Sequence, residues 1–439
     1  MEKTDGKKQK RVIEPELPGG FRDALPQDAI AKEAIIETVK TVYERYGFDP
    51  MQTSAIERTE VLVGGEGEAS KIIFNVQGSR DPFDTAQGKR TSDTALRFDL
   101  TVPLARVLAA NTDIPKPFKR YQIGKVWRGE RQQAGRYREF IQADIDIIGV
   151  KSLDADAEIV QVIYESLRAL GIENFEIKLN NKKEVFALMA SFGIPEEKLI
   201  ATAIAVDKKD KLDATEWEKE VMDASALSQE KTKEYLWRIS GENNLASTEV
   251  AELRRRVEIL GVPQKYLVYD ASLMRGLAYY TGSVFEAVLT DIPEFGSVFS
   301  GGRYDGLTAR FSTQELPAVG ASMGIDRLYA ALEKLGKIDK KETLTNVLML
   351  NLSPNLQAEY AKIAEVLRAG GINTSLYIGD DRSFQGQLAY AIKKEIPLIL
   401  IYGDTEKERS VVQIKDTRTK TQEEVSIQSN IVDYIKTRL

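Results

Sequence analysis

The sequence predicts an α+β protein with an antiparallel sheet flanked by helices, an inserted helical domain and a C-terminal α/β domain. Three features support this prediction. Residues 120–149 alternate apolar and polar side chains on both sides of a short charged loop, as expected of two antiparallel strands in a hairpin. Residues 181–262 are rich in Lys and Glu, have helical spacing and contain no strand-like run. Residues 347–439 alternate strand-like and helix-like segments, which favours a small, mostly parallel sheet.

The N-terminal part of the chain predicts a lead, a helix and several strands. Residues 1–17 are polar, lack the apolar core of a signal peptide and indicate a disordered lead. Residues 26–48 carry apolar side chains at helical spacing, and the helix should end at Gly47. The polar stretch 77–92 has no periodicity and predicts an exposed loop. Strand-like segments surround these features at 49–56, 71–76 and 94–100.

The rest of the chain follows the same logic. A helix at 154–171 and a strand at 174–180 precede the helical region. After that region, a helix is expected at 322–335, and the charged residues 336–346 predict a linker. Further strands are expected at 265–269, 283–289, 296–300, 346–352, 372–378, 396–403 and 410–416. The C-terminal strands alternate with helices, the first at 356–371 and the last at the end of the chain.

Composition excludes several classes of chemistry. The 439 residues include no Cys, so there is no disulfide framework or thiolate metal site, and a cytoplasmic protein is expected. There is also no His, which removes the usual general base, the Ser-His triads and most zinc sites. No apolar run is long enough to span a bilayer. The net charge of −6 does not by itself indicate nucleic-acid binding, although a local basic surface would be enough for such binding.

Charged and glycine-rich segments mark the candidate site. Arg128, Asp144 and Asp146 place charge on the predicted hairpin, either to meet a ligand or to form cross-strand ion pairs on a solvated surface. Asp99 and Thr101 lie two apart and would share a strand face, where they could hold an ammonium group; a strand-end turn before Pro103 is the alternative. Three further segments combine glycines with Arg or Tyr, at 275–286, 299–307 and 319–332.

Taken in order, these segments resemble the histidyl-tRNA synthetase family of class II aminoacyl-tRNA synthetases. The resemblance runs from about Pro18 to the C-terminus. PGGFRD resembles the N-terminal signature of the family, and TVYERYGFDPMQTSAIE resembles class II motif 1. KVWRGERQQAGRYREF resembles motif 2, and VGASMGIDRL resembles motif 3. RGLAYYTG and SGGRYDGL are narrower and resemble the two signature peptides of the histidyl enzymes and their paralogues.

The resemblance implies that histidine and ATP are joined to give histidyl-adenylate and pyrophosphate, with Mg²⁺ neutralising the β- and γ-phosphates. Charge grows on the phosphate oxygens, so cations must already be in place. By this resemblance Arg128 contacts the α-phosphate from one side and Arg275 from the other, while Arg327 holds the γ-phosphate. Glu130 positions the adenine, and Phe140 stacks on it. No protein base is needed, because the attacking carboxylate is already an anion.

The resemblance also assigns histidine recognition and tRNA contacts. Asp146 would accept a hydrogen bond from an imidazole N–H, and Tyr280 would meet the other ring nitrogen or the ring edge. The α-ammonium group would be bound by Asp99, Thr101 and Gln142. The pocket would be closed by Tyr279, Tyr304 and the Gly301–Gly302 backbone. The tRNA acceptor stem would meet three arginines of the hairpin loop, Arg131, Arg136 and Arg138.

The implied organisation is a catalytic domain with an insertion and an anticodon-binding domain. The catalytic domain would comprise 18–180 and 263–335, with the helical insertion at 181–262. The anticodon-binding domain would occupy 347–439 after the linker. The implied partners are histidine and its tRNA, the expected assembly is a homodimer, and no membrane is involved.

Four positions depart from the family pattern: Ser54, Ile141, Ala143 and Ala278. Ser54 replaces the usual proline of motif 1, and Ala278 replaces a common aspartate. Ile141 and Ala143 flank Gln142, so they could change the packing of the pocket. Two other functions stay open. A catalytically silent paralogue resembling the regulatory subunit of ATP phosphoribosyltransferase would share the fold but lack the anticodon-binding domain. A module that binds tRNA without chemistry is the second alternative.

Overall fold

The computed structural model describes residues 13–64, 72–78, 83–84, 89–90, 93–130, 136–209, 212–240, 248–274, 280–312, 315–427 and 430–439. Residues 1–12 of the predicted lead therefore lie outside the described part, and 13–17 form no helix or strand. By their contacts, the residues form two compact units. The N-terminal unit is Met1–Arg22 with Ala34–Lys337, and the C-terminal unit is Asp23–Glu33 with Ile338–Leu439.

An eight-stranded sheet forms the centre of the N-terminal unit. Its strands lie in the order β1, β7, β8, β13, β12, β11, β9, β10, with parallel pairs at the two edges and antiparallel pairs between them. The predicted hairpin at 120–149 is confirmed as β7 and β8. The bounds are β1 (Asp49–Pro50), β7 (Phe118–Trp127), β8 (Glu139–Ile148), β13 (Ala318–Gly324), β12 (Ser297–Arg303), β11 (Ser283–Leu289), β9 (Phe175–Asn181) and β10 (Leu267–Tyr269).

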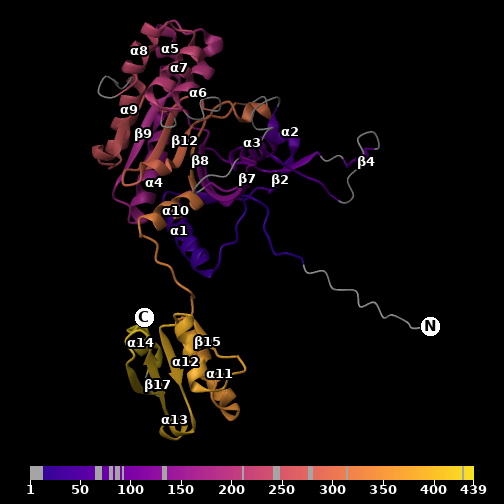
Figure 1. Ribbon diagram of the computed structural model, residues 1–439, viewed down its shortest axis with the longest axis vertical. Helices are drawn as coiled ribbons and strands as arrows, with labels where there is room; N and C mark the ends of the chain where they lie inside the picture. The colour runs from indigo at the N-terminus through magenta and orange to yellow at the C-terminus, as the bar shows by residue number, and fades with distance from the viewer. Residues whose placement is uncertain are drawn as a thin grey trace, which may run out of the picture. The chain divides into compact units, whose positions relative to one another are not determined.

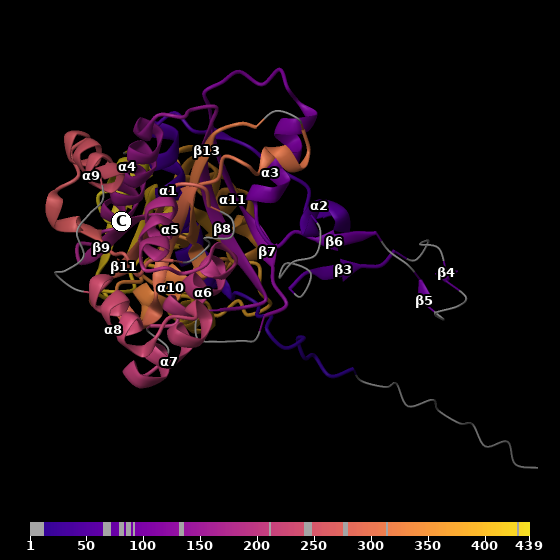
Figure 2. The same cartoon turned by 90° about the horizontal axis from the view of Figure 1, so that it is seen from above.

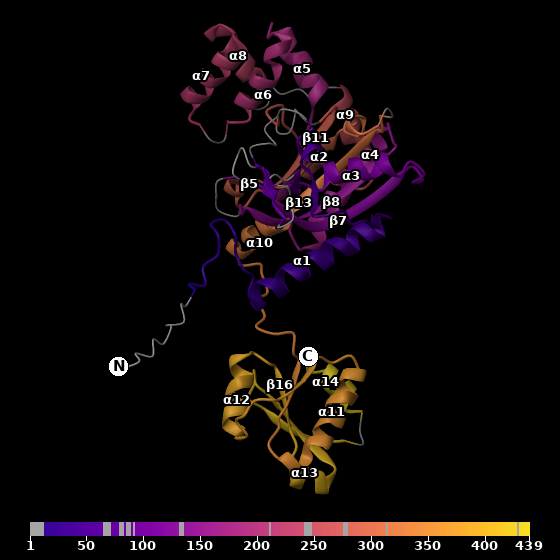
Figure 3. The same cartoon turned by 90° about the vertical axis from the view of Figure 1, so that its right-hand side faces the viewer.

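The two faces of this sheet differ in polarity. On β8, Ala143 and Ile145 are completely buried and alternate with Gln142 and Asp144, so the two pairs point to opposite faces. Helices α4 (Leu153–Ala169) and α10 (Ile325–Lys334) contact β8, and Tyr43 of α1 (Pro26–Arg45) donates a hydrogen bond to the carbonyl of Ala143. Figure 3 shows α1 running beside β7. The polar face of the sheet is thus left for the site.

Smaller elements lie beside β7. Strands β2 (Ile56–Arg58), β6 (Thr94–Leu96) and β3 (Phe74–Val76) form a three-stranded sheet, next to α2 (Thr59–Val63) and α3 (Thr101–Ala110). The strands are shorter than predicted. The expected loop at 77–92 includes a small hairpin of β4 (Phe83–Asp84) and β5 (Lys89–Arg90), which extends away from the large sheet (Figure 2).

Two sequence-based assignments in this unit are wrong. Thr101 is not on a strand with Asp99 but begins α3, because Pro103 is tolerated in the first turn of a helix, where its missing N–H has no helical partner. The helix expected at 322–335 begins only at Ile325, because residues 318–324 form β13 between β8 and β12. The Gly301–Gly302 pair lies within β12 rather than in a turn.

The residues between β9 and β10 are helical, as predicted, and no strand occurs among those that the structure describes. The helices are α5 (Lys182–Ser191), α6 (Leu199–Val206), α7 (Ala214–Ser225), α8 (Gln229–Arg238) and α9 (Thr248–Ile259). Helices α5 to α8 gather at one end of the unit (Figure 1), where Met189, Val206, Val221 and Tyr235 share a buried apolar cluster. Helix α9 instead packs against α4.

The C-terminal unit is a five-stranded sheet between helices. The strands β14 (Val347–Met349), β15 (Thr374–Leu376), β16 (Leu398–Ile401), β17 (Val411–Asp416) and β18 (Gln422–Ser426) lie in the order β15, β14, β16, β17, β18. The prediction of a mostly parallel sheet is wrong, since β17 and β18 are antiparallel and the sheet is mixed. Two helices, α11 (Gln357–Ala369) and α14 (Ile431–Lys436), cover one face and α12 (Phe384–Lys393) the other (Figure 3), with α13 (Asp404–Arg409) between β16 and β17.

Candidate functional site

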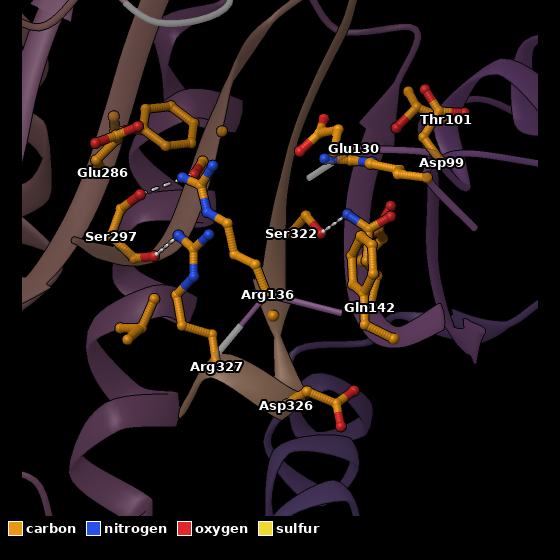
Figure 4. A pocket seen from close by; sticks show the side chains of 18 of the residues that line it. Asp99, Thr101, Glu130, Arg136, Gln142, Glu286, Ser297, Ser322, Asp326 and Arg327 are labelled. Carbon is orange, nitrogen blue, oxygen red and sulfur yellow. Dashed lines mark hydrogen bonds between the residues drawn. The ribbon is translucent and has the colours of Figure 1, made fainter. Parts of the chain in front are cut away.

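A cavity of about 450 Å³ opens over the polar face of the large sheet (Figure 4). Strands β8, β11, β12 and β13 supply its floor, and the starts of α3 and α10 and the residues flanking the β7–β8 loop supply its walls. Its polar and aromatic lining residues are Asp99, Thr101, Arg128, Glu130, Arg136, Tyr137, Phe140, Gln142, Asp144, Tyr280, Phe285, Glu286, Ser297, Ser300, Ser322, Asp326 and Arg327.

Sheet register places several polar side chains in one row across the floor. Asp144 on β8 is paired with Ser322 on β13, which is paired with Ser300 on β12, which is paired with Glu286 on β11. Cross-strand partners point to the same side of a sheet, so these four side chains face the cavity together. The row therefore presents two carboxyls and two hydroxyls to a ligand.

The next row of the sheet contains glycines where side chains from elsewhere approach. A Cβ on Gly302 would lie 2.8 Å from the ring of Tyr280, and a Cβ on Gly320 would lie 2.0 Å from the carboxylate of Asp146. Only a residue without a Cβ allows such close approach. Gly302 of the SGGRYDGL segment thus makes room for the ring of Tyr280 in the cavity wall.

Three arginines line the cavity, namely Arg128, Arg136 and Arg327. The guanidinium of Arg128 lies 5.1 Å from the ring centroid of Phe140, and its Nε donates a hydrogen bond of 3.0 Å to the carbonyl of Phe98. Arg327 donates from Nη1 to the carbonyl of Ser297 at 2.8 Å. Figure 4 shows Arg136 and Arg327 extending in the same direction. Three cations lining one cavity favour the binding of an anion such as a polyphosphate.

Buried carboxyls line the same cavity. Asp99 Oδ1 accepts the N–H of Val102 at 3.1 Å, at the start of α3, and burial raises the pKa of the Asp99 carboxyl to about 6. Burial also raises the pKa of the Asp144 carboxyl, to about 7, against the opposing effect of the Arg120 charge. A cationic ligand stabilises the ionised form of carboxyls in a poorly solvated site, because it supplies the counter-charge that water does not.

Buried polar atoms without a hydrogen-bond partner among the described residues include two oxygens in the cavity lining. They are Oε1 of Gln142 and Oδ1 of Asp144. Gln142 uses its other atom, Nε2, to donate to the hydroxyl of Ser322 at 2.7 Å. Because an unsatisfied buried acceptor is costly, both oxygens are suited to receive hydrogen bonds from a ligand.

Beyond Asp144 the floor is closed by an ion pair. Arg120 is fully buried, and its Nη2 lies 2.7 Å from Oδ2 of Asp146. The other carboxylate oxygen of Asp146 accepts the hydroxyl of Tyr304. Neither Asp146 nor Tyr304 lines the cavity. The predicted contact of Asp146 with a substrate stays a prediction. Its Oδ1 accepts from Tyr304, whereas its Oδ2 lies near the Arg120 cation but has no hydrogen-bond partner among the described residues.

The structure brings most of the predicted site residues together. Nine of them line the cavity: Asp99, Thr101, Arg128, Glu130, Arg136, Phe140, Gln142, Tyr280 and Arg327. Arg138 does not line it but holds the N-terminal segment, since its Nη1 donates to the carbonyl of Gly19 and its backbone N–H to that of Gly20. Arg131, Arg275, Ala278 and Tyr279 lie outside the described residues.

Sequence reasoning missed part of the lining. Asp144 was recognised as a charge on the hairpin but was given no role, although its spacing of two from Gln142 places both on one face. Glu286, Ser300 and Ser322 were missed because only the register of β11, β12 and β13 brings them together. Asp326 lines the rim and accepts the backbone N–H of Ile141 at 2.7 Å.

Comparisons with known proteins agree with this arrangement. A family model described as Histidyl-tRNA synthetase matches residues 20–328, and one described as Anticodon binding domain matches residues 346–438. The histidine–tRNA ligase of Wolinella succinogenes is 40% identical over 93% of this chain and 95% of its own length. That of Clostridium tetani is 36% identical over 96% of this chain and 98% of its own length.

Two solved structures are similar in fold. The crystal structure of histidyl-tRNA synthetase from Nostoc sp. PCC 7120 superposes with a TM-score of 0.84 at 30% identity, covering 98% of this chain and 100% of that chain. An ATP phosphoribosyltransferase regulatory subunit/histidyl-tRNA synthetase from Bacillus halodurans superposes with a TM-score of 0.69 at 22% identity, over 87% of this chain and 97% of that chain. The second likeness bears on the fold alone.

Proposed function

The chain belongs to the histidyl-tRNA synthetase family, whose named relatives are histidine–tRNA ligases, and we propose that its cavity binds histidine and ATP to form histidyl-adenylate. The observation that carries this proposal is the mixed charge of the cavity. Arg128, Arg136 and Arg327 line it together with buried carboxyls and with acceptors that have no partner among the described residues. The phosphates of ATP need the arginines, and the ammonium group of an amino acid needs the carboxyls and acceptors.

In the proposed first step, the histidine carboxylate attacks the α-phosphorus of ATP. A new P–O bond forms, the bond to the bridging oxygen of the β-phosphate breaks, and pyrophosphate leaves. Arg128 would stabilise the charge on the α-phosphate, and Arg327 would hold the γ-phosphate. Phe140 would stack on the adenine and Glu130 would position it, while Arg275 would complete the arginine set from outside the described residues.

The α-ammonium of histidine would lie between Asp99, Thr101 and Gln142. The unsatisfied Oε1 of Gln142 supports this placement, because an ammonium group has three donors to offer. Thr101 lines the cavity from the start of α3, so its position comes from a helix start and not from the strand face assumed in the sequence analysis. Tyr280 would form the wall against the substrate side chain.

Mg²⁺ would enter this cavity bound to the phosphates of ATP. Among the described residues there is no group of three or more His, Cys, Asp or Glu side chains that could hold a metal alone. Mg²⁺ is usually held by one or two carboxylates together with substrate phosphates, and Glu286 is a lining carboxylate on the same side of the cavity as Arg327 (Figure 4). The ion would neutralise phosphate charge there.

The second proposed step transfers the histidyl group to tRNA. The terminal ribose hydroxyl attacks the carbonyl carbon of the adenylate, the acyl–phosphate bond breaks, and AMP leaves. Arg136, which lines the cavity and is exposed, would contact the acceptor end, with Arg131 nearby in sequence. The C-terminal unit would bind the anticodon, in keeping with the family match over 346–438.

We further propose that the chain acts as a homodimer in the cytoplasm. The segment from α1 to β1 resembles the dimer-forming motif 1 of class II enzymes. None of the described helices is long and apolar enough to cross a membrane. The domains would be those expected from the sequence, with the catalytic domain interrupted by α5 to α9.

A silent paralogue is the less favoured alternative. Such a regulatory subunit would need no anticodon-binding domain, whereas this chain matches that family model over nearly the whole C-terminal unit. Both arginines that the proposal places on the phosphates within the described part line the cavity. These two features favour the ligase.

Histidine-dependent ATP–pyrophosphate exchange tests the proposal. We expect exchange with histidine, dependence on Mg²⁺, and none with the other amino acids. Arg327→Ala should reduce exchange at least tenfold without loss of folding, and an exposed substitution such as Arg409→Ala serves as control. A wild-type protein without histidine-dependent exchange would contradict the ligase assignment and leave the silent paralogue.

A further inference from the structure

We propose that Arg97 is a positioning residue for adenylate formation, because its side chain fixes the segment 97–99, which supports one contact for each substrate. Arg97 is not among the residues that line the cavity, so it would act through its neighbours. The inference rests on the proposed function, since it concerns how the same cavity aligns histidine with ATP. Three observations carry it: the neighbours of Arg97 in the chain, the anchors of its guanidinium, and the close approach of Gly124.

The two residues after Arg97 connect the two substrates. The carbonyl of Phe98 accepts a hydrogen bond from Nε of Arg128 at 3.0 Å, and the proposed function places Arg128 on the α-phosphate. Asp99 lines the cavity and would bind the α-ammonium of histidine. A shift of this segment would therefore displace the Asp99 carboxyl and also withdraw the acceptor that orients the Arg128 guanidinium.

The side chain of Arg97 bridges two parts of the chain. Its Nη1 donates to the carbonyl of Thr53 at 2.8 Å, and its Nε donates to the carbonyl of Lys125 on β7 at 3.0 Å. The backbone of Arg97 is held by the same two segments, since its N–H donates to the carbonyl of Ala55 and its carbonyl accepts the N–H of Trp127. A guanidinium is planar and rigid, so donors engaged on both sides fix the position of the whole residue.

The loop that holds Nη1 is itself attached to β7. The N–H of Met51 donates to the carbonyl of Tyr121 at 2.9 Å, and the hydroxyl of Thr53 is hydrogen-bonded to the side-chain amide of Gln122 at 3.0 Å. Strand β7 leads directly into Arg128. The clamp formed by Arg97 therefore fixes the segment 97–99 relative to the strand that carries the phosphate-binding arginine.

Arg97 is held by its geometry and not by an ion pair. The side chain is in a residue that is only 7% exposed, and its hydrogen bonds go to the carbonyls of Thr53, Ser54 and Lys125 and to the Thr53 hydroxyl. Burial lowers the pKa of the guanidinium, and the charge of Asp144 opposes this effect through space. A buried cation is a costly way to gain stability alone, so we assign its retention here to the placement of its neighbours.

Gly124 on β7 provides the space for the guanidinium. A Cβ at this position would lie 2.7 Å from Nη2 of Arg97. The clash falls on the end of a long side chain, so the side chain of Arg97 would shift and the strand would stay in place. Gly124→Ala therefore disturbs the clamp without changing Arg97 itself.

Loss of the clamp should lower the rate more than the affinity for either substrate. Arg128 and Asp99 are still present, so each substrate keeps the groups that bind it. Their relative position changes, and a misplacement of about 1 Å can cost on the order of a hundredfold in rate. A fall in kcat with little change in KM is the expected sign of a contact that matters in the transition state.

The test is steady-state ATP–pyrophosphate exchange by the full-length protein, with kcat and the KM for each substrate measured separately. For Arg97→Ala we expect kcat to fall about tenfold or more, while each KM stays within about threefold of wild type. Arg97→Lys should recover only part of the rate, because an ammonium group lacks the planar fork that reaches both carbonyls.

The matched control is Arg106→Ala. Arg106 lies on α3, and its Nη2 is 2.7 Å from Oε1 of Glu57, outside the cavity lining. Removing it leaves a buried carboxylate unpaired, so the melting temperature should fall while kcat stays within about twofold of wild type. An equal fall of kcat in both alanine variants would show that the rate follows stability alone, and would overturn the role of Arg97.

A second variant tests the clamp from the other side. Gly124→Ala should lower kcat about fivefold or more with both KM values nearly unchanged. In the double variant Arg97→Ala/Gly124→Ala the clash is gone, so kcat should fall little below that of Arg97→Ala. Additive losses would contradict the proposal, because two substitutions that disturb one clamp cannot add.

The outcomes separate the two levels of the argument. If the wild-type protein shows no histidine-dependent exchange, the proposed function fails and the role of Arg97 fails with it. If wild type exchanges and folded Arg97→Ala keeps the wild-type kcat, only the role of Arg97 is overturned. If Arg97→Ala does not fold, Gly124→Ala decides, and a wild-type kcat in that variant overturns the role.

Discussion

At the scale of single residues, the shape of the cavity depends on glycines that make room for functional side chains. Gly302 is the sharpest case, since a Cβ there would lie 2.5 Å from the carbonyl of Ser283 and 2.8 Å from the ring of Tyr280. The carbonyl belongs to the sheet and cannot move far, so the ring must give way. The aromatic wall and the backbone of β12 are therefore adjusted to each other.

We expect Gly302→Ala to displace Tyr280 and to raise the KM for histidine at least fivefold, with a moderate loss of stability from the clash with the sheet. Gly306→Ala is the control on the same segment, because its Cβ would meet nothing within 4 Å. The KM for histidine in ATP–pyrophosphate exchange and the melting temperature are compared between Gly302→Ala and Gly306→Ala. Equal histidine kinetics in both would show that the position of Tyr280 does not matter for binding.

Asp144 also gives a prediction on pH. Burial raises the pKa of its carboxyl to about 7 in the folded protein, whereas an Asp in an unfolded chain titrates near ~3.9. Between these values the folded state binds the extra proton, so the contribution of Asp144 to stability falls as the pH rises. The Asn side chain of Asp144→Asn cannot ionise, so the stability of this variant does not fall with pH for this reason.

The ligand-free variant should therefore gain stability relative to wild type between pH 4 and about pH 7, and the difference should level off above that. Asp99 and Asp146 are present in both proteins but interact with Asp144 through charge, so the difference reports Asp144 together with its coupling to them. Chemical denaturation at several pH values measures it. A stability difference that does not vary with pH would mean that Asp144 titrates at the same pH in both states.

Sequence could identify residues whose chemistry is local but not those whose role depends on register. Arg128 was recognised as a charge on an alternating hairpin, Gln142 and Arg327 were predicted from the family resemblance, and nine predicted residues line one cavity. Glu286 and Ser322 come from different segments of the chain, and only the pairing of β11, β12 and β13 aligns them with Asp144. The engagement of Asp146 could not be predicted either, because Arg120 and Tyr304 reach it from separate elements.

At the scale of elements, a buried ion pair joins the sheet to a helix behind it. Arg303 of β12 lies against Asp156 in the first turn of α4, with Nε donating to Oδ1 at 3.2 Å, and both side chains are buried. The same arginine donates to the carbonyls of Val150 and Ser152. The segment SGGRYDGL thus serves two purposes, since Gly302 makes room in the cavity and Arg303 stabilises the fold.

Removing one partner of this pair leaves a buried charge without compensation. Asp156→Ala should cost about 3–5 kcal/mol of stability. Asp154→Ala is the control in the same helical turn, because Asp154 is 72% exposed and its pair with Arg256 is on the surface, where ion pairs contribute little. The denaturation midpoints of the two variants measure their stability. A similarly small loss of stability in both variants would mean that the carbonyls of Val150 and Ser152 are enough to hold Arg303.

The elements that sequence predicted well have long, regular patterns, such as β7, β8, α4 and α11. Those it missed are set by their surroundings. The segment AVGASMG consists mostly of small residues and has one β-branched side chain, Val319, and it becomes β13 because β8 and β12 pair with it on both sides. In the C-terminal unit, β18 was missed because QEEVS is polar and mostly exposed at a sheet edge.

At the scale of the whole molecule, chemistry and tRNA selection are expected in separate units. The cavity is lined entirely by residues of the N-terminal unit, and the anticodon-binding family match falls in the C-terminal unit. Each unit has its own buried apolar clusters, one containing Met189 and Val221 and another containing Tyr360 and Leu400. Adenylate formation should therefore depend on the first unit, and recognition of the tRNA on both.

Ending the chain after Lys337 tests this division. The truncated protein should keep exchange activity within about tenfold of wild type, because every described residue of the cavity is retained. It loses the partners of residues 23–33, which cluster with the C-terminal unit, so some loss of stability is expected.

Transfer of histidine to tRNA should fall much further than exchange. The truncated chain must select its tRNA through the acceptor end alone, and Arg136 is one of the cavity-lining cations that could contact that end. Measuring exchange and aminoacylation on the same preparation separates the two effects, since misfolding lowers both alike. Aminoacylation that falls no further than exchange would place tRNA selection in the N-terminal unit and remove the anticodon-binding role from residues 346–438.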